Sequence, residues 1–360
     1  MAGIAATLPL YSSRPRIKID GNHDARLDAG VVSLSVKENE EGLYHCELTL
    51  GNWGTVNSDL DFLYFDRQVF DFGRELQIEM GDGSAAAQVF LGRITGIEGR
   101  FIESRPPEIL ILAEDRLQDL RMTRRTRSFE DVSLEDVVET IAGDHNLQAE
   151  IDIDSPRYKN LSQLNQSDLA FLRDRARLID AEVWAEGNRL YVQSRSRKKV
   201  AELEVVYKQH LHEFLVSADL AHQRTTFSAS GWDVQSKEKF EVEVDKSAIE
   251  SELEGGLSGA QVLQQSFGER HDSIVHLTPT SNEETQSLAE THFRTLSRQF
   301  VSGKGIAEGD ARYKAGAKIN IQGVGPIFSG PYFVNSVHHM FSQEGGYLTQ
   351  FSVERPAIGV

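Results

Sequence analysis

The sequence predicts an α+β fold that is mainly β, with a small α/β module in the middle of the chain. Three observations support this prediction. Apolar and polar residues alternate along several short segments of the first third, as in half-buried strands. Apolar residues at helical spacing begin after residue 125, and alternation returns after residue 198.

The first third contains segments with a period of two at 32–37, 44–50 and 75–80. In the second of these, Tyr44, Cys46, Leu48 and Leu50 fall on one face, and His45, Glu47 and Thr49 on the other. Turn residues separate the segments, which predicts an antiparallel barrel or sandwich. Cys46 is then expected in the core and not as a nucleophile.

The middle of the chain, 126–198, carries two helix signals and a hairpin signal. Ser133 and Asp136 have capping-box spacing ahead of a helix that should end near Gly143. Ser167 or Asp168 can cap a second helix with a stripe of apolar residues at 169, 172, 176 and 179. The segment 181–192 turns around Gly187 and predicts a β-hairpin.

The last part of the chain is β-rich with inserted helices. We expect strands at 202–207, 240–244, 317–323, 330–341 and 347–353. The stretch 246–261 predicts a loop. Ser281, with Glu284 in capping-box position, starts a helix that carries Ala289, Phe293, Leu296 and Phe300 on one side.

Composition excludes several classes of function. The chain has 55 acidic and 38 basic residues and a net charge of −17, so we expect no nucleic-acid partner. The one basic cluster, Arg121, Arg124, Arg125 and Arg127, is expected to be a solvated face or a face that forms salt bridges between subunits. We find no apolar run of membrane-spanning length and no leader segment, and therefore expect no membrane anchor. The single cysteine indicates a reducing cytoplasm.

No motif predicts a metal site. His338 and His339 are neighbours in a predicted strand, so their side chains point to opposite faces. His210 and His212 could share a face, but no further ligand completes the three that catalytic zinc usually takes. The acidic stretch 152–155 lacks the glycine and distal glutamate of a calcium loop.

No motif predicts a catalytic or cofactor site either. The stretch 81–87 matches a dinucleotide fingerprint by letters, but a strand is expected after it, and Asp82-Gly83 favours a hairpin turn. No nucleophile elbow is present. We therefore predict no catalytic, cofactor-binding or metal-binding residues and no enzyme activity.

Four segments, in this order along the chain, resemble the phage late control D family, the central baseplate hub of contractile tails and the hub half of the VgrG spike proteins. They are "VFLGRITGIEGRF" (89–101), the segment 111–147 with its "AEDRL" element, "NQSDLAFLRDRARLIDAEVWAEGNRLYV" (165–192) and "YFVNSVHHMFSQEGGYLTQFSVER" (332–355). Each match is moderately specific, and together they span most of the chain.

The resemblance implies two tube-like antiparallel β-barrels with small α/β domains between them. The expected division is a first barrel at 1–125, a small α/β domain at 126–198, and a second barrel with inserted helices at 199–360. Three copies are expected to form a ring in which six barrels match a six-fold tail tube. The other end of the ring would seat a three-fold spike.

The expected partners are further copies of the chain, a separate trimeric spike, an Hcp-like tail tube protein and baseplate wedge proteins. The particle would be assembled in the bacterial cytoplasm as part of a phage tail, a tailocin or another injection machine. VgrG chains continue into a spike, whereas this one ends at Val360, so a hub-only polypeptide is expected.

Two other function classes remain open. One is a cell-wall glycan or peptidoglycan hydrolase on a β-scaffold, although acidic residues are too common here for any pair to be informative. The other is a carbohydrate-binding module, which would use exposed aromatic side chains. The three tryptophans, Trp53, Trp184 and Trp232, are each expected to pack in a core instead.

Overall fold

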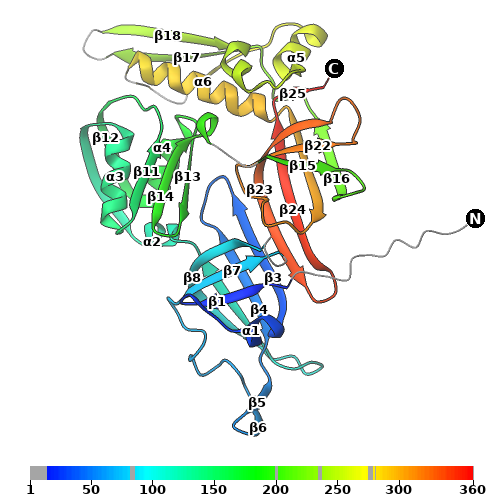
Figure 1. Ribbon diagram of the computed structural model, residues 1–360. Helices are drawn as coiled ribbons and strands as arrows, with labels where there is room; N and C mark the ends of the chain where they lie inside the picture. The colour runs from blue at the N-terminus through cyan, green and yellow to red at the C-terminus, as the bar shows by residue number, and fades with distance from the viewer. Residues whose placement is uncertain are drawn as a thin grey trace, which may run out of the picture.

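The computed structural model describes residues 14–81, 86–198, 202–233, 237–274, 279 and 281–359. Strands dominate and helices are fewer, which confirms the predicted α+β, mainly β class. The described residues form four units, each with its own hydrophobic core. In Figure 1 one unit lies at the bottom, one at the left, one at the right and one at the top.

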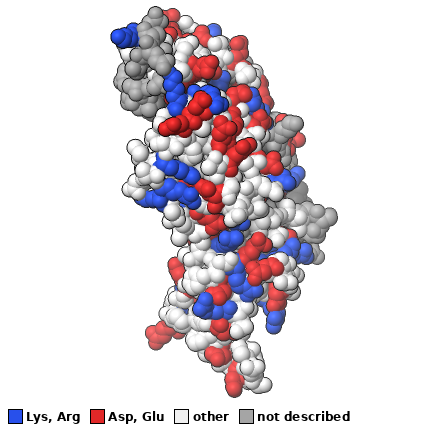
Figure 2. All heavy atoms as spheres, turned by 90° about the vertical axis from the view of Figure 1, so that its left-hand side faces the viewer, with Lys and Arg blue, Asp and Glu red and all other residues white. Residues whose placement is uncertain are grey.

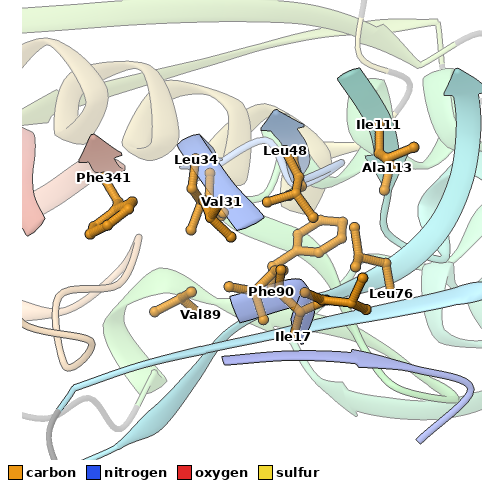
Figure 3. Close-up of a cluster of buried hydrophobic side chains, with 14 of the residues drawn as sticks. Ile17, Val31, Leu34, Leu48, Leu76, Val89, Phe90, Ile111, Ala113 and Phe341 are labelled. Carbon is orange, nitrogen blue, oxygen red and sulfur yellow. The ribbon is translucent and has the colours of Figure 1, made fainter. Parts of the chain in front are cut away.

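The N-terminal unit forms the lower part of Figure 1 and encloses the core shown in Figure 3. Leu76, Ile78 and Met80 are fully buried in it, and so is Cys46, as the alternation predicts. The elements of this unit are β1 (Arg16–Ile19), β2 (Asn22–His23), α1 (Ala25–Gly30), β3 (Val31–Asn39), β4 (His45–Gly51), β5 (Gly54–Val56), β6 (Asp59–Asp61), β7 (Glu75–Met80), β8 (Ala87–Arg100) and β9 (Glu108–Glu114).

The start of β3 departs from the predicted alternation. A register shift between Val31 and Ser33 interrupts its pairing with β4. A bulge of this kind adds a residue to one strand and exchanges the faces locally. Val31 is therefore buried and Val32 is only half-buried, whereas Leu34 follows the predicted pattern.

The α/β module lies at the left of Figure 1 and confirms both predicted helices and the hairpin. Ser133 forms a capping box with Asp136, and Ser167 accepts the backbone N–H of Ala170 at 3.2 Å. The elements of the module are α2 (Leu117–Arg121), β10 (Arg124–Val132), α3 (Leu134–Asp144), β11 (Gln148–Asp152), β12 (Tyr158–Ser167), α4 (Asp168–Arg177), β13 (Ala181–Glu186), β14 (Arg189–Ser194) and the 3₁₀ helix η2 (Arg195–Arg197).

The second β unit stands at the right of Figure 1 and has its own core, with Tyr332 and Phe351 among the largest buried side chains. The predicted strands of the C-terminal region are confirmed here. The elements of this unit are β15 (Glu202–Val206), β16 (Leu211–Ala218), β21 (Val301–Glu308), β22 (Lys318–Gln322), β23 (Gly330–Ser342) and β24 (Gly346–Arg355).

A smaller unit lies across the top of Figure 1, with α6 packed against the sheet of β17, β18 and β20. Its elements, with one short strand pair beside it, are β17 (Thr226–Asp233), β18 (Glu238–Asp245), η3 (Lys246–Glu252), α5 (Gly259–Phe267), β20 (His271–Ile274), α6 (Asn282–Arg298), β19 (Leu257–Ser258) and β25 (Ala357–Ile358). Ser281 caps α6 as predicted, but the helix ends before Phe300. The predicted loop 246–261 is wrong in part, because η3 and the start of α5 lie within it.

One sheet joins the two β units. Strand β23 pairs with β22 along its first residues and with β3 along its last, while β24 lies along its other edge. The resulting 13-stranded sheet follows the order β16-β21-β24-β23-β3-β4-β9-β8-β7-β1-β2, with β22 and β15 attached beside β23. Among the described residues no sheet closes on itself, because β23 connects the two units instead of closing either one.

The described helices are short. The longest, α6, has 17 residues and carries charged side chains along its length. None of the described helices is both long enough and apolar enough to pass through a membrane.

Candidate functional site

The units meet at a junction of charged side chains that are mostly hidden from solvent. Arg298, at the end of α6, is 2% exposed and makes two-pronged contacts to two carboxylates. Its guanidinium lies 2.5 Å and 2.6 Å from the oxygens of Asp180, which follows α4 in the α/β module. The same group lies 2.6 Å and 2.8 Å from the oxygens of Glu252 in η3. Arg298 thus connects the upper unit to the α/β module.

Arg195 makes a second connection, between the α/β module and the large sheet. It lies in η2 and contacts Glu354 of β24 at 2.5 Å and Glu40, just after β3, at 3.4 Å. The guanidinium carbon is 3.5 Å from the ring centroid of Phe333, so the charge is also in contact with an aromatic face. Asn335 donates to the second oxygen of Glu354 at 2.8 Å.

Lys198 adds a third contact at the same junction. Its ammonium donates to Glu182 at 2.7 Å and lies 4.2 Å from the ring centroid of Trp184. Trp184 in turn stacks on Tyr191, with ring centroids 5.0 Å apart. A cleft of about 570 Å³ opens beside these residues, between β8, β11 and residues 312–317.

Glu38 is the most deeply buried carboxyl group of the junction. It lies in β3, is 3% exposed and accepts the backbone N–H of Ala315 at 3.4 Å. Burial raises the pKa of Glu38 to about 7, although the charge of Lys314 acts in the opposite direction. Near neutral pH both the neutral and the ionised forms of this carboxyl group are therefore populated.

These contacts fix the units relative to one another. Buried charges that are fully paired add little net stability, but loss of one partner leaves the other charge uncompensated. Any rotation of one unit against its neighbours would separate Arg298 or Arg195 from its carboxylates. The junction favours one arrangement of the units. Its charged groups are already paired with one another.

The candidate metal ligands do not come together. His338 and His339 point to opposite faces as predicted: His338 lies 2.8 Å from the hydroxyl of Ser35, and His339 is 1% exposed on the other side. The Tyr347 hydroxyl donates to one ring nitrogen of His339, and the other donates to the carbonyl of Tyr313. Burial lowers the pKa of His339 to about 3, so its ring is neutral. Among the described residues no three metal-ligating side chains of His, Cys, Asp or Glu gather.

The other two candidate motifs have ordinary structural explanations. Residues 82–85, including the predicted Asp82-Gly83 turn, lie outside the described residues, but β7 pairs with β8 on either side of them. A strand therefore follows the fingerprint, as expected, and not a helix. Asp152 contacts Arg197 at 3.1 Å, and Asp154 contacts the same guanidinium.

The basic cluster is a salt-bridging face within the chain. Arg125 and Arg127 both contact Asp144 and the 1%-exposed Asp168 of α4 at distances of 2.7–3.2 Å. Burial acts to raise the pKa of Asp168, but hydrogen bonds from Gln163 and His145 and the two guanidinium groups outweigh it and lower the pKa. On this side of the molecule basic and acidic side chains alternate and form no single basic patch (Figure 2).

The tryptophan predictions are correct for one residue of three. Trp184 is 8% exposed, whereas Trp53 and Trp232 are 43% and 53% exposed. Both exceptions lie near the edges of their units, in the link between β4 and β5 and in β17. An aromatic residue in a strand pattern indicates burial only if another layer covers that face, and alternation alone does not show where layers end.

The large sheet has open edges. Among the described residues β16 has a strand partner only on the side of β21, and β15 only on the side of β22. Leu215 of β16 is 72% exposed. An unpaired edge presents free backbone donors and acceptors that another chain can extend.

Among family models, curated proteins and solved structures, only the solved structures bear on the fold of this chain. The family model described as the Alg8 N-terminal domain matches residues 12–343. No curated protein sequence matches the chain. The 43 kDa tail protein of prophage MuSo2 from Shewanella oneidensis has a TM-score of 0.71 at 12% identity, over 96% of this chain and 99% of that one.

Two further solved structures share the fold. A tail protein from Neisseria meningitidis MC58 gives a TM-score of 0.67 at 10% identity, over 97% of this chain and 98% of that one. The E. coli c3393 protein, a component of the type VI secretion system, gives 0.58 at 10% identity, over 94% of this chain and 76% of that one. The fold of this chain is therefore the fold of phage tail proteins and of a type VI secretion component.

Proposed function

The chain belongs to the Alg8 N-terminal domain family. From its architecture and its structural likeness to tail proteins, we propose that it is the central baseplate hub of a contractile phage tail or injection machine. The observation that carries the proposal is the joining of two β units, each with its own core, by one continuous open sheet. The fold shared with tail proteins over nearly the whole chain supports it. The particle would be assembled in the bacterial cytoplasm.

In this proposal the two β units, within 1–125 and 199–360, act as tube-like barrels, and the α/β domain at 126–198 fixes the angle between them. Three copies form a ring, so that six β units face a six-fold tail tube and the opposite end seats a three-fold spike. Open edges such as β16 favour such a ring, since cyclic association covers every edge, whereas a monomer leaves them free to aggregate.

The function proposed here depends on shape and requires no reacting group or cofactor. Its partners are two further copies of the chain, a separate trimeric spike, an Hcp-like tube protein and baseplate wedge proteins. The buried contacts of Arg195 and Arg298 contribute by holding the units at fixed angles.

Light scattering of the purified protein, run through a sizing column, tests the proposal. We expect a mass three times that of the 40.2 kDa chain, and retention of the tube or the spike protein when it is added. A mass that stays monomeric at high protein concentration, with no binding of either protein, would refute the hub function.

A further inference from the structure

The lower end of the molecule carries an exposed cluster of aromatic and aliphatic side chains, called here the aromatic platform. It comprises residues from the β4–β5 link, from β6 and the segment after it, and from the segment after β8. They are Trp53, Leu60, Phe62, Phe101 and Ile102, which are exposed, together with Phe65, which is partly buried. Figure 1 shows β5 and β6 extending below the rest of the N-terminal unit.

The rings of the platform form one continuous set of edge-to-face and tilted contacts. Phe62 lies at its centre, with ring centroids 5.2 Å from Trp53, 5.2 Å from Phe65 and 5.8 Å from Phe101. Phe65 and Phe101 are 5.7 Å apart. Such contacts favour a defined arrangement of the rings, so the platform has a definite shape.

The backbone beneath the platform is fixed by Asn52, which is fully buried. Its side-chain oxygen accepts the backbone N–H groups of Leu63 and Tyr64 at 2.9 Å and 2.8 Å, and its backbone N–H donates to the carbonyl of Pro107 at 2.8 Å. Through its side chain and its backbone, this one residue ties together three segments that bear or border the platform. At Gly99 a Cβ atom would lie 2.8 Å from the ring of Phe101, so the close approach of that ring favours glycine.

The exposure of the platform is unusual for this chain. Thirteen large hydrophobic side chains of the described residues are exposed, and five of them lie here, with exposures of 38–67%. Scattered exposed hydrophobic residues are normal, but a contiguous group marks a contact surface. Aromatic residues, phenylalanine included, are also enriched at protein interfaces.

The rim of the platform is acidic. Several exposed charged residues of these segments have no ion-pair partner among the described residues. Five are acidic, Asp59, Asp61, Asp66, Glu98 and Glu103, and one is basic, Arg100. The lower end of Figure 2 shows white surface broken mainly by red. A partner surface that complements it must be apolar at its centre and basic around it.

We propose that the aromatic platform docks a different protein of the same particle, through an apolar pocket rimmed by Lys or Arg. This proposal rests on the proposed function in one respect, namely that the chain is part of a phage tail or injection particle. A second copy of the chain presenting its own platform is a poor occupant, because two platforms would bring their acidic rims together. Anionic lipid headgroups would be repelled by the same rim.

The test uses the full chain and three purified probes: the tube, spike and wedge proteins of the same particle. Binding of each is measured by interferometry with the wild type and with a platform variant, Phe62→Ser together with Phe101→Ser. We expect one probe to lose affinity by about tenfold or more. Trp232→Ser, a comparably exposed residue at the opposite end, is the matched control and should leave that affinity unchanged.

A second variant keeps the rings and reverses the rim, with Asp59→Lys and Asp61→Lys. It should weaken the same probe and flatten the dependence of its affinity on salt between about 0.05 and 0.5 M. Thermal unfolding and light scattering confirm that both variants keep the fold and the mass of the wild type. These readings also separate this proposal from the hub function, since a monomer that binds a probe through the platform contradicts only the latter.

Three results would overturn the proposal. The first is equal binding of all three probes by the wild type and the platform variant. The second is a fall in the mass of the assembly in the platform variant, because the occupant would then be a second copy. The third is flotation of the wild type, but not of the variant, with vesicles of phosphatidylethanolamine and phosphatidylglycerol.

Discussion

At the scale of single residues, the arrangement of the units depends on charged side chains that are largely hidden from water and paired with one another. Arg298 pairs with Glu252 inside the upper unit and with Asp180 of the α/β module, so the second contact crosses between units. In such an arrangement the free energy of desolvating the charges is about equal to the free energy gained from their attraction. Removal of one partner leaves a buried charge unpaired, and this strongly destabilises the fold. The network therefore selects one geometry more than it adds stability.

Replacement of Arg298 by methionine should expose this dependence. Arg298→Met leaves two carboxylates without their base, and we expect it to lower the free energy of unfolding by about 3–5 kcal/mol. Urea denaturation measures the loss. The control is Arg312→Met, which removes an ion pair whose arginine side chain is 69% exposed and should cost less than about 1 kcal/mol. Equal losses in the two variants would show that burial of the Arg298 network has no special role.

Glu38 gives a prediction for pH dependence. Its pKa is raised from 4.5 to about 7, so the stability linked to it is fully present below about pH 4.5 and is lost as pH rises through about 7. We expect the free energy of unfolding to fall between about pH 5 and pH 8, and Glu38→Gln to reduce that fall by on the order of 2 kcal/mol. Urea denaturation across this range measures both. Glu344→Gln, at an exposed turn, should leave the fall unchanged; the same fall in wild type and Glu38→Gln would contradict the assignment.

Local sequence patterns predicted many residues of this chain correctly and missed the junction. The caps Ser133, Ser167 and Ser281 and the buried face of β7 follow from rules that act within a few residues. Arg195 and Arg298 belong to polar segments, and their burial depends on units that are distant in sequence. No local pattern distinguishes such an arginine from a solvated one.

At the scale of elements, two long strands organise the large sheet. β8 pairs with β7 along its first half and with β9 along its second, and β23 likewise passes from β22 to β3. The sequence predicts a strand at both places. Local sequence could not predict the partners of these strands, because a change of partner along a strand leaves no local pattern.

The change of partner in β8 takes place at Arg93, directly after Gly92. A Cβ atom at Gly92 would lie 2.2 Å from the backbone oxygen of Glu114, which cannot move without disturbing β9. We expect Gly92→Ala to lower the free energy of unfolding by about 1–3 kcal/mol. In Gly143→Ala, the matched control in α3, the new methyl group meets nothing within 4 Å, and the variant should be neutral or more stable by up to about 1 kcal/mol. Thermal unfolding that ranks the two variants in the opposite order would contradict this account of the β8 crossing.

At the scale of the whole molecule, the arrangement consists of two β units on one sheet, with helical units beside and above them. Alternation of apolar residues and the resemblance to hub proteins predicted the mainly β class. The junction between units and the aromatic platform were not predicted, since both depend on which surfaces the fold leaves covered or open. In the proposed function, the contacts of Arg195 and Arg298 at the junction keep the two β units at a fixed spacing.

Electron microscopy of the purified particle would show directly whether three copies of the chain form the proposed ring. We expect class averages with a three-fold axis and, around it, six β units in which the two from each chain alternate. A particle without a three-fold axis, or one in which each chain contributes only one unit to the ring, would contradict it.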